Sequence, residues 1–204
     1  MPIHRSAFEK AFPSDAERAE IATVASVVDQ LVAKLTQQDV DINRAHVVGA
    51  QSSVIQAIVG ATLRDIGFGE EVVLTPQDGL VTRSRPDFVL PLGPGRGVMA
   101  EVERGGTVNN NHDLKDMWKA HIAVDIQHLV LVVPNLNWKT DGGGRERPYP
   151  RVCSRVGAFF GDPRREVDVL SAHVIGYGLM SPPSIDLVRE DGVKVVLEDA
   201  PSDE

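Results

Sequence analysis

The sequence predicts one α/β domain with a mixed β-sheet core of order α-β-β-β-α-β, flanked by helices and preceded by an amphipathic helix. Three observations support this prediction. Apolar residues recur at helical spacing over 14–36 and 44–66. Short apolar runs separated by proline and glycine turns then follow up to residue 103, as in a hairpin meander. A fully apolar run at 128–133 indicates a buried parallel strand.

The N-terminal helix, 14–36, begins with a capping box in which Ser14 is the N-cap and Glu17 lies three residues later. The second helix, 44–66, carries so many apolar residues that most of its surface should be buried. Gly67 should end it. The remaining core elements are predicted as strands at 71–75, 86–90 and 97–103, a turn at 91–95, a helix at 110–122 capped by an asparagine, and a strand at 128–133.

Residues 135–198 are predicted to elaborate the C-terminal side of this core. Within them, 152–160 has the pattern of a short helix, and 166–175 that of a strand with alternating apolar residues. Residues 199–204 have the composition of a disordered acidic tail. The chain, 1–204, is long enough for one domain with a substantial core and short for two.

The composition excludes several classes of protein and site. A single cysteine, Cys153, excludes an internal disulfide and a cysteine-rich zinc site. The six histidines show no metal-ligand spacing and are interpreted as structural. No apolar run approaches the roughly 20 residues of a membrane span, and the first residues lack the apolar core of a secretory signal. We therefore expect a cytoplasmic protein that has no membrane partner.

The net charge of −8 argues mildly against a nucleic-acid-binding protein, since such proteins are usually basic. The charge is, however, unevenly distributed. Residues 186–204 carry seven acidic residues and two basic ones, whereas 139–165 carry seven basic residues and three acidic ones. A local basic surface matters more for phosphate contact than the global sum does. The charge therefore weakens the case for nucleic-acid binding without reversing it.

Three acidic residues lie at the ends of two predicted neighbouring strands. Asp87 follows Pro86 and leads into one strand, and Glu101 and Glu103 end the next. Such a cluster cannot stay fully ionised in a confined site without a counter-cation. Oxygen ligands of this kind suit Mg²⁺ or Mn²⁺, and such an ion can activate a water molecule and bind a phosphodiester. The pattern therefore favours phosphodiester cleavage.

Each of these acidic residues also has a structural interpretation. Asp87, after a proline, could simply cap the turn into its strand. Glu101 and Glu103 lie on one face of their strand, because side chains alternate with period two. If that strand were at the edge of the sheet, both could be solvated surface groups.

The residues and the element order together resemble the PD-(D/E)xK nuclease superfamily, which has the restriction-endonuclease-like fold. The resemblance covers roughly 46–134, with Pro86-Asp87 at the PD position and Glu101-Val102-Glu103 at the (D/E)xK triplet. It implies Mg²⁺-dependent cleavage of DNA, with Asp87 and Glu101 as metal ligands. Glu70 could offer a further ligand or could be a solvated strand end.

One residue departs from the family pattern, because Glu103 occupies the lysine position. A subset of type II restriction enzymes is similar here, with an E-x-E triplet. A glutamate could act as a ligand or as a water-orienting base, but it cannot offer positive charge to the phosphate. Lys115 and Lys119 lie four residues apart on the next helix and could replace the lysine. Both fall off the predicted core face of that helix, which comprises Leu114, Met117, Trp118 and Ile122.

We therefore predict a Mg²⁺- or Mn²⁺-dependent DNA endonuclease of restriction or defence type, acting as a homodimer on two-fold symmetric DNA. Asp87, Glu101, Glu103 and Lys115 are the predicted catalytic residues. The residues predicted to bind nucleic acid are Lys119, Lys139, Arg145, Arg147, Arg164 and Arg165. One alternative is a catalytically degenerate module of the same fold that binds protein or nucleic acid. Another is a structure-specific or RNA-directed nuclease, which would share the site and differ only in substrate.

Overall fold

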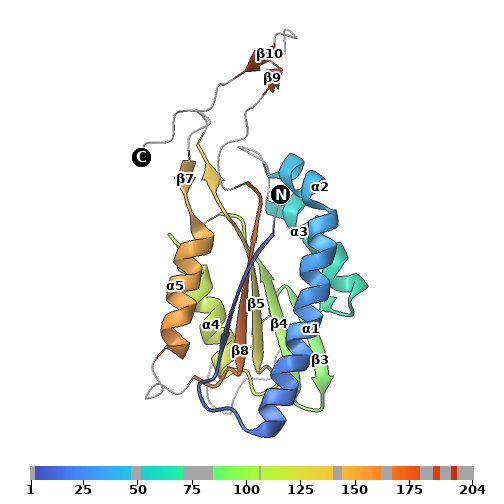
Figure 1. Ribbon diagram of the computed structural model, residues 1–204, viewed down its shortest axis with the longest axis vertical. Coiled ribbons are helices and arrows are strands. Elements are labelled where there is room, and N and C mark those ends of the chain that lie inside the picture. The colour runs from blue at the N-terminus through green and yellow to red at the C-terminus, as the bar shows by residue number, and fades with distance from the viewer. Residues whose placement is uncertain are drawn as a thin grey trace.

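The structure, a computed structural model, describes residues 3–46, 52–70, 85–105, 107–139, 144–161, 167–179, 186–188 and 194–196. Within these ranges the helices are α1 (Asp15–Gln37), α2 (Asp39–Ala45), α3 (Ser52–Asp65), α4 (His112–Ile122) and α5 (Pro148–Phe160) (Figure 1). The strands are β1 (His4–Glu9), β2 (Gly69–Glu70), β3 (Phe88–Gly93), β4 (Arg96–Val102), β5 (His128–Pro134), β6 (Asn137–Trp138), β7 (Gly144–Glu146), β8 (Ser171–Tyr177), β9 (Asp186–Val188) and β10 (Lys194–Val196).

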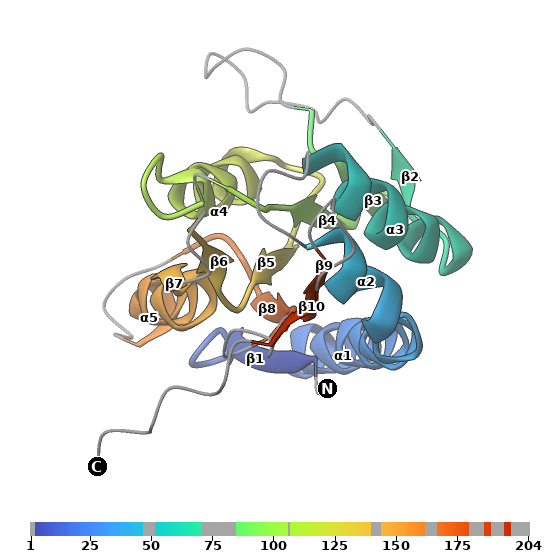
Figure 2. The same cartoon turned by 90° about the horizontal axis from the view of Figure 1, so that it is seen from above.

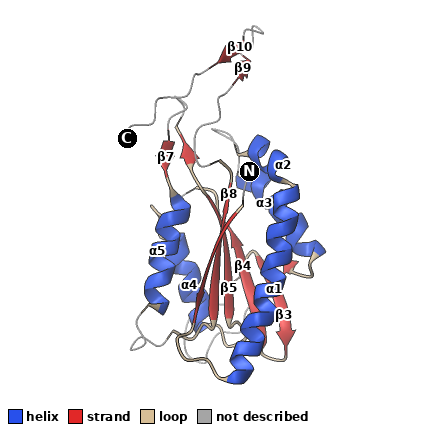
Figure 3. Ribbon diagram, in the orientation of Figure 1, coloured by secondary structure: helices blue, strands red, loops and turns tan. Residues whose placement is uncertain are grey.

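Six of the strands form one mixed sheet in the order β1-β8-β5-β4-β3-β2 (Figure 3). The central strands β4, β5 and β8 are parallel to one another, and the outer pairings are antiparallel. Every residue of β5 and of β8 is buried, as expected for parallel strands covered on both faces. The predicted α/β fold with a mixed sheet is confirmed, in the core order α3-β2-β3-β4-α4-β5.

Helices cover both faces of the sheet (Figure 2). One core lies under α1, α2 and α3 and includes Val98, Ala100 and Val102 of β4. The other lies under α4 and α5 and includes Met99 of β4. Alternate residues of β4 therefore enter opposite layers, so Glu101 lies on the same face as Met99, toward α4.

The helix predictions hold for most of the chain but fail at two points. The capping box of α1 is present, since Ser14 Oγ accepts from the Glu17 amide and the Glu17 carboxylate accepts from the Ser14 amide. The predicted continuous helix 44–66 is wrong, because α2 ends at Ala45 and the next residue, His46, has a ψ of 61°, which is not helical. The His46 ring is buried, donates to the Leu136 carbonyl at 2.8 Å and packs edge-on against Tyr177. These contacts with distant parts of the chain override the helical pattern.

The face of α4 is the second failure. Trp118, expected in the core, is 56% exposed, whereas Asp113 and Asp116 are buried. The N-cap of α4 is Asn111, as expected in residue type, but it is left-handed and its side chain makes no capping hydrogen bond. The helix is therefore rotated about its axis relative to the prediction, which brings charged residues toward the sheet.

Strand boundaries differ from the predictions for local reasons. β3 continues through Pro91 and Leu92, which were expected to turn, because it pairs with β4 as far as Gly93, with a bulge after Pro91. β8 begins later than predicted and shows no alternation, because both of its faces are covered. β1, which the sequence pattern missed, pairs with β8. The strand expected at 71–75 and the tail at 199–204 lie outside the described residues.

A chain of polar side chains crosses the sheet beneath α1. Glu20 accepts from the Nε2 of buried His128 at 2.9 Å and is also paired with Arg96. Ser171 Oγ lies 2.8 Å from His128 Nδ1 and 3.2 Å from His173 Nε2. Burial, aided by the charges of Arg5 and His128, lowers the pKa of His173 to about 3.

In the described part of the chain, no helix is long and apolar enough to cross a membrane.

The neutral state of His173 predicts a specific loss of stability in acid. His173 titrates near its ordinary pKa of about 6.5 when unfolded, so the unfolded chain binds more protons below that pH. The free energy of unfolding should fall below about pH 6.5, by ~1.4 kcal/mol per pH unit for this group. His173→Gln should therefore lose about 2 kcal/mol less than wild type between about pH 7 and about pH 5 in urea unfolding. Equal losses in the two chains would contradict this prediction.

Candidate active site

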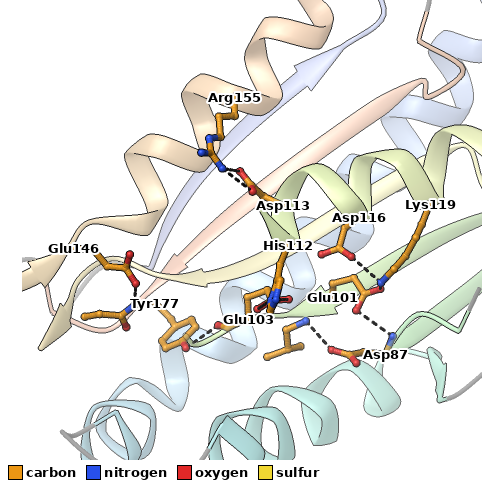
Figure 4. Close-up of polar contacts among 12 residues, drawn as sticks. Asp87, Glu101, Glu103, His112, Asp113, Asp116, Lys119, Glu146, Arg155 and Tyr177 are labelled. Carbon is orange, nitrogen blue, oxygen red and sulfur yellow. Dashed lines mark hydrogen bonds and ion pairs between the residues drawn. The ribbon is translucent and has the colours of Figure 1, made fainter. Parts of the chain in front are cut away.

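The β3–β4 hairpin brings Asp87 and Glu101 together at the end of a central strand (Figure 4). The Asp87 amide donates to Glu101 Oε2 at 3.3 Å, and Asp87 Oδ2 accepts from the Val102 amide at 3.0 Å. The Glu101 side chain is thus bonded to the backbone just before β3, and the Asp87 side chain to the backbone of β4. The Asp87 side chain therefore ties the start of β3 to the end of β4, and its carboxylate lies beside Glu101 (Figure 4).

Glu101 is buried, with 5% of its surface exposed. β4 lies between β3 and β5, so the edge-strand interpretation of Glu101 and Glu103 is wrong. Burial, together with the charge of Asp116, raises the pKa of Glu101 to about 8, although Lys119 opposes the shift. A buried acid with a strongly displaced pKa, near others of its kind, is typical of a functional site.

Lys119 of α4 reaches into this acidic group (Figure 4). Its ammonium lies 2.9 Å from Glu101 Oε1 and 2.7 Å from Asp116 Oδ1. Burial favours the neutral amine, but the carboxylates of Asp116 and Glu101 outweigh it and raise the pKa of Lys119. Burial also raises the pKa of Asp116, whose Oδ2 is enclosed and accepts no hydrogen bond from a described residue. Asp87, Glu101, Glu103 and Asp116 are called the acidic cluster below, and Lys119 is the counter-cation that Glu101 and Asp116 share.

Glu103 pairs with a histidine that the sequence interpretation treated as structural. Both carboxylate oxygens of Glu103 lie within reach of His112 Nδ1, at 3.0 and 3.1 Å. The Glu103 side chain is 17% exposed and that of His112 is 34% exposed. Burial raises the pKa of Glu103, while the hydrogen bond from His112 opposes that rise.

The start of α4 is held by an ion pair with α5. Arg155 Nη1 donates to Asp113 Oδ1 at 3.0 Å and to the Val108 carbonyl at 3.3 Å. Asp113 is fully buried, so its charge requires this partner. The pair fixes the first turn of α4 and with it the position of His112.

Two of the predicted site residues, Lys115 and Glu70, lie outside the acidic cluster. Lys115 is exposed on α4 and lies outside the acidic cluster. Glu70 is half-exposed and paired with Arg64, and both line a cavity of about 510 Å³ together with Arg85 and Asp87. Glu70 therefore shares a cavity with Asp87 without joining the cluster.

The predicted nucleic-acid-binding residues divide into three groups. Lys119 lies in the acidic cluster. Lys139, Arg145 and Arg147 are exposed on and beside β6 and β7. These two strands follow β5, whose C-terminal end lies at the same end of the sheet as that of β4. Arg164 and Arg165 lie outside the described residues.

Sequence reasoning missed Asp116 and His112 as members of this site. A usable signal was present, because Asp116, Lys119 and His112 are three and four residues apart and so share one helical face. The prediction that the side of α4 with Trp118 faces the core is incompatible with this pattern, because Trp118 is exposed and Asp116 is buried. The close pairing of Glu103 with His112 depends on how α4 lies against β4, which no local pattern reveals.

The donor atoms of the cluster are carboxylate oxygens, which suit hard divalent cations. Among the described residues, no three histidine, cysteine, aspartate or glutamate side chains converge closely enough to form a metal site. The Lys119 ammonium lies between two of the acidic residues, and it provides the positive charge that the cluster requires.

Comparisons with known proteins support the fold. No protein-family model matches the sequence, and no curated protein matches it significantly. The structure is similar to the crystal structure of the restriction endonuclease BglII complexed with a DNA 16-mer, with a TM-score of 0.51 and 10% sequence identity. The similarity covers 87% of this chain and 78% of that one, and it supports a restriction-endonuclease-like fold.

The raised pKa of Glu101 predicts that the site costs stability at alkaline pH. The folded carboxyl keeps its proton up to about pH 8, whereas the unfolded one loses it near its ordinary pKa of about 4.5. The contribution of this group is therefore present in acid and is lost as the pH rises through that interval.

Glu101→Gln should accordingly raise the free energy of unfolding by roughly 2 kcal/mol or more at about pH 8.5, and change it little at about pH 4.5. Denaturant unfolding at both pH values measures the effect. Glu9→Gln, at an exposed position, serves as the control. A destabilised Glu101→Gln at alkaline pH would show that the carboxylate and Lys119 form a net favourable pair instead.

Proposed function

We propose that the protein is a Mg²⁺-dependent endonuclease that hydrolyses DNA phosphodiester bonds. The observation that carries this proposal is the acidic cluster with Lys119, at the end of a central strand in a fold similar to that of a restriction endonuclease. Buried carboxylates of raised pKa around one cation form a site poised to exchange that cation for another. Mn²⁺ is expected to substitute for Mg²⁺, since both prefer oxygen ligands.

Asp87 and Glu101 are the proposed metal ligands, and Asp116 is the most suitable addition to them. Its enclosed Oδ2 has no hydrogen-bond donor among the described residues, so an oxygen ligand is available beside Glu101. Glu70 would act more remotely, from the shared cavity. The metal, when bound, would neutralise the phosphate and lower the pKa of a bound water molecule.

Lys119 is better placed than Lys115 to take the part of the missing lysine. Its ammonium already lies within the acidic cluster, whereas Lys115 is exposed outside it. If a divalent cation takes the carboxylates, the released ammonium is free to contact the scissile phosphate. Lys119 would then offer the positive charge that Glu103 cannot.

DNA is the proposed substrate because cationic side chains line the cavity beside Asp87 and follow β5. Arg64 and Arg85 line the cavity beside Asp87, and Lys139, Arg145 and Arg147 lie at the same sheet edge. Such residues give position and salt-dependent affinity more than sequence choice. A cytoplasmic homodimer with a restriction or defence role remains part of the proposal by analogy of fold.

One observation favours the alternative, a catalytically degenerate binding module. Lys119 compensates Glu101 and Asp116 without any metal, so the cluster can persist as a purely structural ion network. In that case the fold would serve binding alone, and neither Mg²⁺ nor Mn²⁺ would bind.

Cleavage of supercoiled plasmid in Mg²⁺, Mn²⁺ or EDTA tests the proposed function. We expect nicking that requires the metal and disappears in Asp87→Ala, with discrete fragments if the enzyme is sequence-specific. Calorimetric titration with Mn²⁺ should show binding that Asp87→Ala weakens. If the wild-type chain neither cleaves DNA nor binds metal, the binding module is the function that remains.

The two lysines of α4 provide a matched pair of variants. We expect Lys119→Met to lower kcat by roughly 100-fold or more, and Lys115→Met to change it by less than about threefold. Circular dichroism and thermal unfolding would establish that both variants fold. The reverse ranking of the two variants would restore Lys115 to the catalytic role.

A further inference from the structure

The pair formed by Glu103 and His112 is built more rigidly than a surface contact requires. The Glu103 amide donates to the Val132 carbonyl at 2.8 Å, and the Tyr177 hydroxyl donates to the Glu103 carbonyl at 2.9 Å. Tyr177 is fully buried. The backbone of Glu103 is therefore fixed on both sides, by β5 and by the end of β8, although the residue lies beyond the last residue of β4.

His112 is held with comparable precision from the opposite layer. Its amide donates to the Thr107 carbonyl at 2.9 Å, and it is the first residue of α4. Arg155 ties the neighbouring Asp113 to α5 and also donates to the Val108 carbonyl. Two independently anchored elements thus present one carboxylate to one ring nitrogen, at 3.0 and 3.1 Å.

The second ring nitrogen of His112 remains available. Both hydrogen bonds of the ring to described residues use Nδ1, and a third of the side chain is exposed. A carboxylate that accepts from Nδ1–H leaves the lone pair on Nε2. The ring also lies beside the acidic cluster, since it contacts Glu103 and lies one helical turn before Asp116 on α4 (Figure 4).

We propose that His112 is the catalytic base of the proposed nuclease and that Glu103 is its positioning residue. This inference rests on the proposed function. It assigns a task to the residue at the lysine position of the triplet: Glu103 holds the His112 ring so that Nδ1 donates to the carboxylate and Nε2 can accept a proton.

The proposed step is balanced in atoms and charge. His112 Nε2 takes a proton from a water molecule while the oxygen of that water molecule forms a bond to phosphorus. The P–O ester bond to the leaving sugar breaks, and the departing oxygen takes a proton from solvent. The imidazolium formed on His112 lies against the Glu103 carboxylate until it returns its proton to water.

Two substitutions of His112 separate catalysis from positioning. The amide NH₂ of His112→Asn can replace Nδ1–H as a donor to Glu103 but cannot take a proton. We expect His112→Asn and His112→Ala both to lower kcat by roughly 100-fold or more, and added imidazole to restore part of the activity of His112→Ala. His121→Asn, on the same helix and away from the cluster, is the control and should keep its activity.

A spectroscopic measurement tests the pair without reference to cleavage. In ¹⁵N-histidine NMR spectra of the neutral ring, His112 should carry its proton on Nδ1. Glu103→Gln should shift the ring toward the Nε2–H tautomer. A predominant Nε2–H tautomer in the wild-type chain would overturn the proposal.

The kinetic outcomes are equally decisive. Activity retained in His112→Asn but lost in His112→Ala would make His112 only a holder of Glu103 and would overturn its role as base. Full activity in every His112 variant would do the same. If the wild-type chain and Asp87→Ala are equally inactive, the proposed function itself has failed and the role of His112 fails with it, whatever the tautomer.

Discussion

The placement of β4 between β3 and β5 is the constraint on which the candidate site depends. A strand in that position has both faces covered, so an acidic residue near its end must enter a packed layer. Glu101 does so beside α4, where the cost of burying its charge is large unless a cation is near. The ammonium of Lys119, on the facing side of α4, meets that requirement.

α4 therefore has two tasks that oppose each other. It must pack on the sheet, which Met117 and Ala120 accomplish, and it must also carry charge into the same interface. The ion pair of Arg155 with Asp113 secures the first turn, and Lys119 compensates the acidic residues near the last. Exposure of Trp118 follows from this orientation, because a helix cannot turn both faces toward the sheet.

Asp87 and Glu101 were predicted to be neighbours, because hairpin pairing and the period of two are local rules. Lys119 was predicted to bind nucleic acid and His112 was interpreted as structural, because the residues that they contact lie 18 and 9 residues away in another layer. Helix 44–66 failed for the same reason, since the ring of His46 bonds to Leu136, 90 residues away.

The sequence by itself determined the alternation of helices and strands, the capping box of α1, the buried character of β5 and the meeting of Asp87 with Glu101. Each depends on neighbours within a turn, a hairpin or a short run, where periodicity and turn chemistry act directly. Only the tertiary structure decided the rotation of α4, the pairing of Glu103 with His112 and the position of the Lys119 ammonium. These features depend on packing between layers. The free energy of that packing depends on the whole core, so it produces no periodic pattern along the chain.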